Sequence, residues 1–246
     1  MKTNNFDTLK DFMDFSDPNK FYLALVVQRK KDNPELDRSE MIIKNYMIPS
    51  LEKLEYVRAE METLCQVFNA RVYLYTNRRS FKNTQKAMAK ILIDQICAES
   101  VSNLNHLFDS CAAAHGCGDK FWIIDVDMPN KPDVCSSDSY MRFESEVKMK
   151  LFDELEGMEP ELPDGGRRVQ LVLPTKNGFH IVTKPFDTRE WRNIVGRMSC
   201  IEEKYGLQVE LELKKDAMVN LILPPEQTDA KIYRSKQFGK TTTTAK

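Results

Sequence analysis

Long apolar runs are absent from this chain of 246 residues. No segment approaches the roughly 20 apolar residues that a membrane helix requires, and the first residues lack the hydrophobic stretch of a signal peptide. The six cysteines stand at irregular spacings, without a Cys-x-x-Cys pair, in a chain too long to depend on disulfides. We therefore expect a cytoplasmic protein with free thiols and no membrane association.

Histidine is also scarce, with three in the chain, and the formal net charge of -1 neither favours nor excludes nucleic acid as a partner. Cys111, His115, Cys117 and Cys135 carry the side chains that zinc prefers. Their spacing lacks the short knuckle of structural zinc sites, so buried or incidental cysteines are the favoured interpretation and zinc is the alternative.

The segment pattern predicts an α+β fold with one mixed or antiparallel central sheet. Strands are expected at residues 21–28, 71–75, 121–127, 168–173, 178–183, 208–213 and 219–223. Helices are expected at residues 39–68 with a break at Pro49, 83–114, 140–155 and 188–205. We expect a single domain over residues 1–230, with a helix-rich half (1–118) and a motif-bearing half (119–230), followed by a basic tail at 231–246.

The most informative stretch is residues 121–127, an apolar strand that ends in Asp125 and Asp127. Because side chains alternate along a strand, the two carboxylates point the same way and repel one another. A divalent cation relieves this repulsion, and oxygen ligands favour Mg²⁺ or Mn²⁺. The competing interpretation is that Asp127 caps the next segment and Asp125 is solvated.

Two further strands carry residues suited to the same chemistry. His180 could donate to a phosphate, and Gly178 could allow a ligand to approach closely, although a lone histidine in an apolar strand is usually a core residue. Glu210 and Glu212 alternate with aliphatic residues, which puts both on one face of a strand. Any half-solvated strand shows that pattern as well.

Taken in order, these motifs resemble those of the archaeo-eukaryotic primase superfamily, the primase-polymerases. That family has an apolar strand ending in Asp-x-Asp, then a small-x-His strand, then an apolar residue followed by an acid. The matching segments here are Ile124-Asp125-Val126-Asp127, Gly178-Phe179-His180 and Val209-Glu210. The match covers about residues 71–225, and the family's Arg-x-Pro-like end falls at residues 220–225, which contain no arginine.

The resemblance implies an RNA-recognition-motif-like catalytic half, two divalent metals (Mg²⁺ or Mn²⁺), and template-directed nucleotidyl transfer of the kind a DNA primase or DNA polymerase performs in DNA replication. The metals would be held by Asp125, Asp127 and Glu210, with Glu212 as the alternative third acid. Implied partners are nucleoside triphosphates, a single-stranded or primed DNA template, and a replication protein such as a helicase.

The resemblance also implies a set of phosphate ligands. The nucleotide triphosphate would be bound by His180 and Lys176 with Arg78 or Arg79, although those two arginines follow a strand and an ordinary solvated turn is the favoured alternative for them. Lys214, Lys215 or the tail could replace the missing arginine. The DNA backbone would contact the basic segments 29–31, 78–79 and 167–168 and the tail, because phosphate contacts dominate affinity for nucleic acids.

Three other functions use parts of the same residue set. A glycosyltransferase holds Mn²⁺ and a nucleotide sugar with Asp-x-Asp, and a metal-dependent nuclease shares two-metal chemistry with polymerases. A catalytically degenerate primase-like module would bind nucleic acid without reaction, and the missing arginine favours it. The concentration of like charges around one point favours an enzyme, because such charges are costly without a metal.

Overall fold

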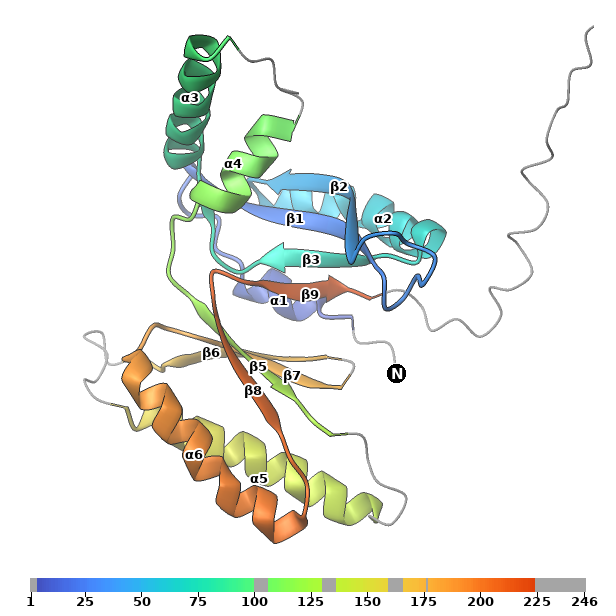
Figure 1. Ribbon diagram of the computed structural model, residues 1–246, viewed down its shortest axis with the longest axis vertical. Coiled ribbons are helices and arrows are strands. Elements are labelled where there is room, and N and C mark those ends of the chain that lie inside the picture. Colours follow the sequence, from blue (N-terminus) through green and yellow to red (C-terminus); the bar gives the residue numbers. More distant parts are fainter. Residues whose placement is uncertain (1–3, 100–105, 130–135, 159–165, 176, 224–246) are drawn as a thin grey trace, which may run out of the picture.

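The structure is a computed structural model that describes residues 4–99, 106–129, 136–158, 166–175 and 177–223. Within these ranges the chain forms two antiparallel sheets and six helices, with one sheet above the other in the view of Figure 1. The α+β class is confirmed, whereas the expectation of one central sheet is wrong. None of the helices in these ranges is long and apolar enough to cross a lipid bilayer.

The first sheet has the strand order β2-β1-β3-β9, and a short strand, β4, pairs with one end of β1. Its strands are β1 (Lys20–Arg29), β2 (Glu40–Ile48), β3 (Arg71–Tyr75), β4 (Arg79–Ser80) and β9 (Met218–Ile222). Four helices accompany it: α1 (Phe6–Phe12), α2 (Leu51–Phe68), α3 (Phe81–Cys97) and α4 (Leu107–His115). Helix α1 has no counterpart in the prediction, and the helix expected at 83–114 is divided into α3 and α4.

Strand β2 shows that the helix predicted over residues 39–48 is wrong. It pairs antiparallel with β1, and a register shift between Val26 and Val27 interrupts the pairing. A bulge of this kind disrupts simple alternation, and the apolar residues of β2 fall at both odd and even positions, which resembles helical spacing. The helix begins instead at α2, where the Ser50 side chain accepts a hydrogen bond from the amide of Lys53.

The second sheet is built from a continuous βαββαβ segment. In chain order its elements are β5 (Trp122–Asp127), α5 (Ser137–Glu156), β6 (Val169–Pro174), β7 (Gly178–Thr183), α6 (Thr188–Tyr205) and β8 (Glu210–Lys215). The strands lie in the order β6-β7-β5-β8, with every neighbouring pair antiparallel. Helices α5 and α6 cover one face, where Ile124, Val126 and Ile181 pack in a core with residues of both helices (Figure 1).

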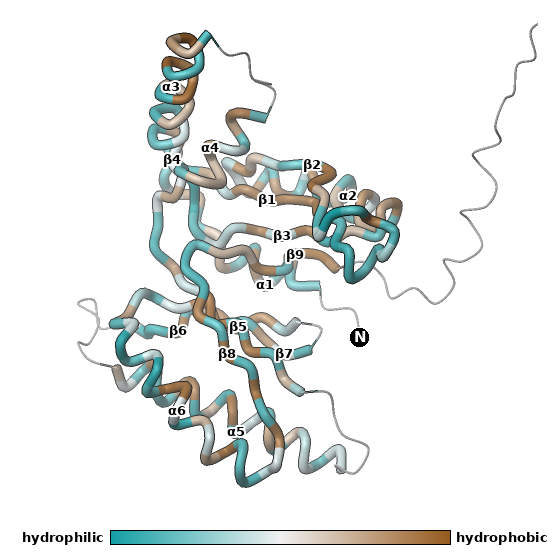
Figure 2. Tube along the Cα trace, viewed as in Figure 1, coloured by the Kyte–Doolittle hydropathy of each residue, from teal (hydrophilic) through white to brown (hydrophobic). Residues whose placement is uncertain are grey.

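The other face of the second sheet packs in part against the first sheet. Ile123, Leu173 and Val182 share a core with residues of α1, α2 and β9, and both β1 and β9 are largely apolar (Figure 2). The Asn5 side-chain amide, just before α1, donates to the carbonyls of Pro174 in β6 and Asn220 in β9 at 3.1 and 2.9 Å. The two sheets are therefore joined by apolar packing and by a polar bridge.

Strand β9 crosses from the second sheet back to the first. After β8 the chain turns at Asp216, whose φ is 51°, and β9 then pairs antiparallel with β3. The strand expected at residues 219–223 does form, but it belongs to the sheet of the N-terminal half rather than to that of the motifs.

Candidate functional site

Three strands bring the sequence motifs to one face of the second sheet. Asp125 on β5 lies opposite His180 on β7 and opposite Glu212 on β8. One step of the alternation further along β5, Asp127 lies opposite Gly178 and Glu210. Because directly opposite residues in antiparallel strands have their side chains on the same face, the motifs form one polar site.

Asp125 is the centre of the hydrogen bonds in this site. His180 Nε2 donates to Asp125 Oδ1 at 3.0 Å, and Lys214 Nζ donates to Asp125 Oδ2 at 2.5 Å. Lys214 also lies 3.0 Å from Glu212 Oε2. The Asp125 side chain is only 17% exposed, so solvent weakly screens its interactions with His180 and Lys214.

The charges around Asp125 keep its carboxylate ionised. Burial by itself would raise the pKa of Asp125, but the hydrogen bonds and charges of His180 and Lys214 outweigh it and lower this pKa to about 2. For Lys214 burial would lower the pKa, but the carboxylates of Asp125 and Glu212 raise it above the ordinary lysine value. Asp125 and Lys214 are therefore a charged pair at neutral pH.

This pair predicts a pH dependence of stability. A depressed pKa contributes stability above the ordinary aspartate value of 3.8, and this contribution is lost as the pH falls to about 2. We expect the difference in unfolding free energy between the wild type and Asp125→Asn to shrink by about 2 kcal/mol from about pH 6 to about pH 2. Urea unfolding at several pH values measures it, and a difference independent of pH would contradict the assignment.

Gly178 accommodates the backbone of β5 rather than a ligand. A Cβ atom at this position would lie 1.9 Å from the carbonyl oxygen of Val126. Just beyond, the amide of Met128 donates to the carbonyl of Asn177 at 2.8 Å, so the two chains stay close. The interpretation of Gly178 as an opening for a ligand is thus replaced by one based on strand packing.

Gly178→Ala is expected to lower the unfolding free energy by about 2 to 3 kcal/mol, because overpacking forces β5 and β7 apart. Gly196→Ala is the matched control, since nothing lies within 4 Å of a Cβ there and Gly196 is within α6. That control is expected to gain about 0.5 to 1 kcal/mol from helix propensity. Thermal unfolding of both variants provides the comparison, and equal behaviour would contradict the close contact.

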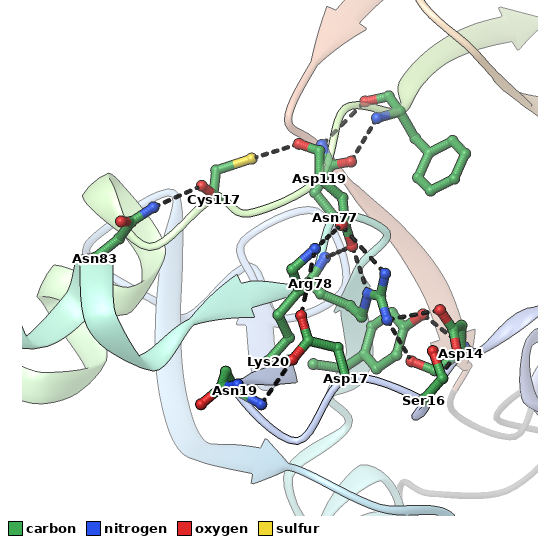
Figure 3. A network of polar contacts seen from close by, with 12 residues as sticks. Asp14, Ser16, Asp17, Asn19, Lys20, Asn77, Arg78, Asn83, Cys117 and Asp119 are labelled. Carbon is green, nitrogen blue, oxygen red and sulfur yellow. Dashed lines mark hydrogen bonds and ion pairs between the residues drawn. The ribbon is translucent and has the colours of Figure 1, made fainter.

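Arg78 lies outside the polar site, in an ion-pair network between β1, β3 and the segment before β5. Its Nε donates to Asp119 Oδ2 at 2.6 Å, and its NH1 donates to Asp14 Oδ2 at 2.7 Å (Figure 3). Lys20 binds the other carboxylate oxygen of Asp119 at 2.7 Å. The structure therefore gives Arg78 protein partners in place of the nucleotide expected from the sequence.

Arg79 is fully buried and is also engaged within the protein. Its NH1 donates to Asp216 Oδ2 at 2.8 Å, and its guanidinium lies over the Tyr75 ring at 3.9 Å. Asp216 directly follows β8, whose last residue lies opposite Trp122 at the far end of β5 from Asp127. The predicted role of Arg79 in nucleotide binding is thus not supported by its position, and Lys176 lies outside the described residues.

Lys214 and Lys31 are more closely connected with the site than the sequence analysis predicted. Lys214 was considered only as a substitute for a missing arginine, yet it contacts Asp125 directly. Lys31, in the turn after β1, has a pKa lowered by burial and by Arg71 and Arg29, while the charge of Asp127 acts in the opposite direction. The turn after β1 therefore places positive charge within electrostatic range of the Asp127 end of the site.

The oxygen donors of the site match the preference of a hard divalent cation. Within the described residues, however, no group of three or more histidine, cysteine, aspartate or glutamate side chains is drawn together as a ready-made metal site. Lys214 and His180 instead supply the partners of Asp125. Asp127 and Glu210 are exposed and have no ion-pair partner in the described ranges.

The cysteine group considered for zinc is not assembled either in the part of the chain that the structure describes. Cys111 is buried in α4, and Cys117 Sγ lies 3.0 Å from the carbonyl oxygen of Asp119. Cys135 falls outside the described residues. These cysteines have local contacts, and their arrangement adds no support for zinc.

Comparisons with known proteins leave the function to be inferred from this geometry. No protein-family model matches the chain, and no curated protein and no solved structure matches it at a significant level.

Proposed function

We propose that this chain is a primase-polymerase-like nucleotidyltransferase whose reaction takes place at Asp125, Asp127 and Glu210. The observation that carries the proposal is the strand register. It sets the Asp-x-Asp pair on β5 between the histidine strand β7 and the acidic strand β8, with the motif residues directly opposite one another. Polar residues of the sheet gather on the face opposite α5 and α6, and the register further sets the three motifs directly opposite one another on adjacent strands.

The topology of the second sheet supports the same proposal. A βαββαβ segment with the strand order β6-β7-β5-β8 is a split βαβ arrangement, which is also the arrangement expected of an RNA-recognition-motif-like catalytic half. The motifs lie on β5 and on its two immediate neighbours. The helices α5 and α6 cover the opposite face, and the first sheet covers the polar face only in part, so the exposed end around Asp127 and Glu210 is left for substrates.

Charge supports the binding of Mg²⁺ or Mn²⁺. Asp127 and Glu210 lie directly opposite one another, and like charges in that relation destabilise a sheet. Asp127, Glu210 and Asp125 would hold the cation. The hydrogen bond from Lys214 to Asp125 would then have to break, so that this carboxylate oxygen could bind the cation. Such an ion, when bound, neutralises a triphosphate and activates an attacking hydroxyl.

His180 and Lys214 have distinct roles in this proposal. His180 orients Asp125 and helps to keep it ionised, and a phosphate would gain the Nε2 proton only by replacing Asp125 as the acceptor. Lys214 is 35% exposed on a flexible stem, so it can turn from Asp125 toward the incoming phosphates. It occupies the role of the arginine that the family's pattern would place further along the chain.

Extension of a labelled primed template, together with dinucleotide formation on an unprimed one, tests the proposal. Each is measured with Mg²⁺ or Mn²⁺ for the wild type and for Asp125→Ala combined with Asp127→Ala. We expect metal-dependent products from the wild type and none from the double variant. The matched control combines Asp94→Ala on α3 with Asp153→Ala on α5, two exposed aspartates outside the polar face, and should retain full activity.

Other outcomes would replace the proposal with one of the alternatives. Shortening of the substrate, lost in the same double variant, would assign a nuclease. Tight binding of nucleic acid without any product would assign a degenerate binding module. Transfer from a nucleotide sugar, with no reaction of nucleoside triphosphates, would assign a glycosyltransferase.

A further inference from the structure

Helix α3 carries three lysines, Lys82, Lys86 and Lys90, which we call the lysine stripe. We propose that the lysine stripe binds the phosphate backbone of a nucleic acid, a choice of partner that rests on the proposed function. The three residues are spaced four apart, so they follow one face of the helix over about 12 Å. All three are exposed.

The position of α3 leaves this face open. The helix packs through its inner face against α4 and β4, and Thr84 is the residue of α3 that is buried. In Figure 1 the helix projects beyond β2 and away from both sheets, and Figure 2 shows that polar and apolar residues share its surface. The exposed lysine stripe is therefore accessible to a long polyanion.

Folding alone does not explain the lysine stripe. Like charges four residues apart on a helix repel each other, and Lys82 stands in the first turn, where the helix dipole disfavours a cation. That turn contains no acidic residue, and within the described ranges none of the three lysines has an ion-pair partner. A bound polyanion would remove both unfavourable interactions.

Four of the five lysines on the other described helices form an ion pair with a glutamate, and Lys53 on α2 is the exception. Lys148 on α5 and Lys204 on α6 each lie 2.7 Å from a glutamate carboxylate. The two arginines that precede α3 are likewise engaged with aspartates. Within the described residues, the lysine stripe therefore has three adjacent positive charges without an ion pair, with Asp94 as the one acidic residue of α3, while these other cations are paired within the protein.

The end of α3 carries exposed apolar residues, which make an anionic lipid surface the alternative partner. Ile93 and Ile96 are 59% and 75% exposed there. A basic helix with exposed apolar residues is also suited to an anionic lipid surface. The lysines occupy the first three turns and the isoleucines only the end, which favours a polyanion contacted along the length of the helix.

The test is fluorescence anisotropy of a labelled single-stranded oligonucleotide at several salt concentrations, without nucleotides or added metal. The variant replaces Lys82, Lys86 and Lys90 with glutamine, and the charge-matched control replaces Lys44, Lys53 and Lys204 with glutamine. We expect the stripe variant to lose at least about tenfold in affinity at low salt. Its slope of log affinity against log salt should decrease by about 2, as expected for three lost phosphate contacts.

The control variant is expected to bind within about twofold of the wild type, and thermal unfolding should show both variants folded. An equal loss in the two variants, an unchanged salt slope, or no binding by the wild type would overturn the inference. So would a loss of binding to anionic phospholipid vesicles with oligonucleotide binding retained. The assay measures oligonucleotide binding and needs no catalysis, so the variant that combines Asp125→Ala with Asp127→Ala should still bind. A chain that binds through the lysine stripe but forms no product would therefore contradict the proposed reaction and leave the lysine stripe supported.

Discussion

Glu210→Gln is expected to lower the rate of nucleotide incorporation by at least about 100-fold, whereas Glu212→Gln lowers it by less than about tenfold. Glu210 lies opposite Asp127 and has no ion-pair partner in the described part of the chain. Glu212 lies opposite Asp125 and already contacts Lys214. The two glutamates share a residue type, a strand and an exposed position, so each is a control for the other.

The dependence on metal concentration gives this comparison a second readout. Loss of a metal ligand should raise the Mn²⁺ concentration needed for half-maximal rate in Glu210→Gln, while Glu212→Gln should leave it near the wild-type value. Steady-state rates over a Mn²⁺ titration measure both effects. A larger loss for Glu212→Gln would assign that residue as the third acid and place the metal next to Asp125 and Lys214.

Asp119→Ala is expected to destabilise the fold by about 3 to 4 kcal/mol, because its removal leaves the largely buried Arg78 and Lys20 with only the more exposed carboxylates of Asp14 and Asp17. Asp119 accepts hydrogen bonds from Arg78 and Lys20, and its side chain is only 12% exposed. Burial opposes its ionisation, yet those two cations lower its pKa below the ordinary value. Asp119 is therefore the least exposed carboxylate of the network in Figure 3 and the one that Arg78 and Lys20 share.

Urea unfolding of Asp119→Ala against Glu62→Ala measures the effect. Glu62 pairs with Arg58 on the surface of α2, where both side chains are more than a third exposed, and such pairs contribute about 0.5 kcal/mol or less. Similar losses in the two variants would show that the network around Asp119 is no more stabilising than an ordinary surface pair.

The second sheet could be predicted from sequence more closely than the first. Strand β7 and helix α6 match their expected limits, because each has a clear period and a clear boundary. Asp187 caps α6 at one end, and Gly206 ends it with φ 65°. In the first sheet β2 has no such clear period, since its pairing with β1 contains a bulge.

The division into two sheets could not be predicted from local patterns. Strands β8 and β9 are separated by a short turn at Asp216, which is typical of a hairpin. Instead they belong to different sheets, and β9 pairs with β3 far back in the chain. Such a pairing is decided by long-range packing, which no local period encodes.

The candidate site was predictable where alternation along a strand was sufficient. Alternation predicted that Asp125 and Asp127 share a face and that Glu210 and Glu212 share a face. Only the resemblance joined these residues to His180 in one site, and the register brings all of them to one face of the sheet. The same alternation, continued two residues beyond Glu212, would have put Lys214 on that face. Arg78 and Arg79 were harder to interpret, because their aspartate partners lie far away in the sequence.

The pairing of β3 with β9 also bears on how the protein is made. During synthesis β3 emerges early, but β9 follows only after the whole βαββαβ segment, on the order of 10 s later at ordinary translation rates. Until then one edge of β3 offers unpaired backbone groups to other chains. The nascent chain is thus most prone to aggregation before β9 is synthesised. Its dependence on chaperones should fall once β9 has left the ribosome.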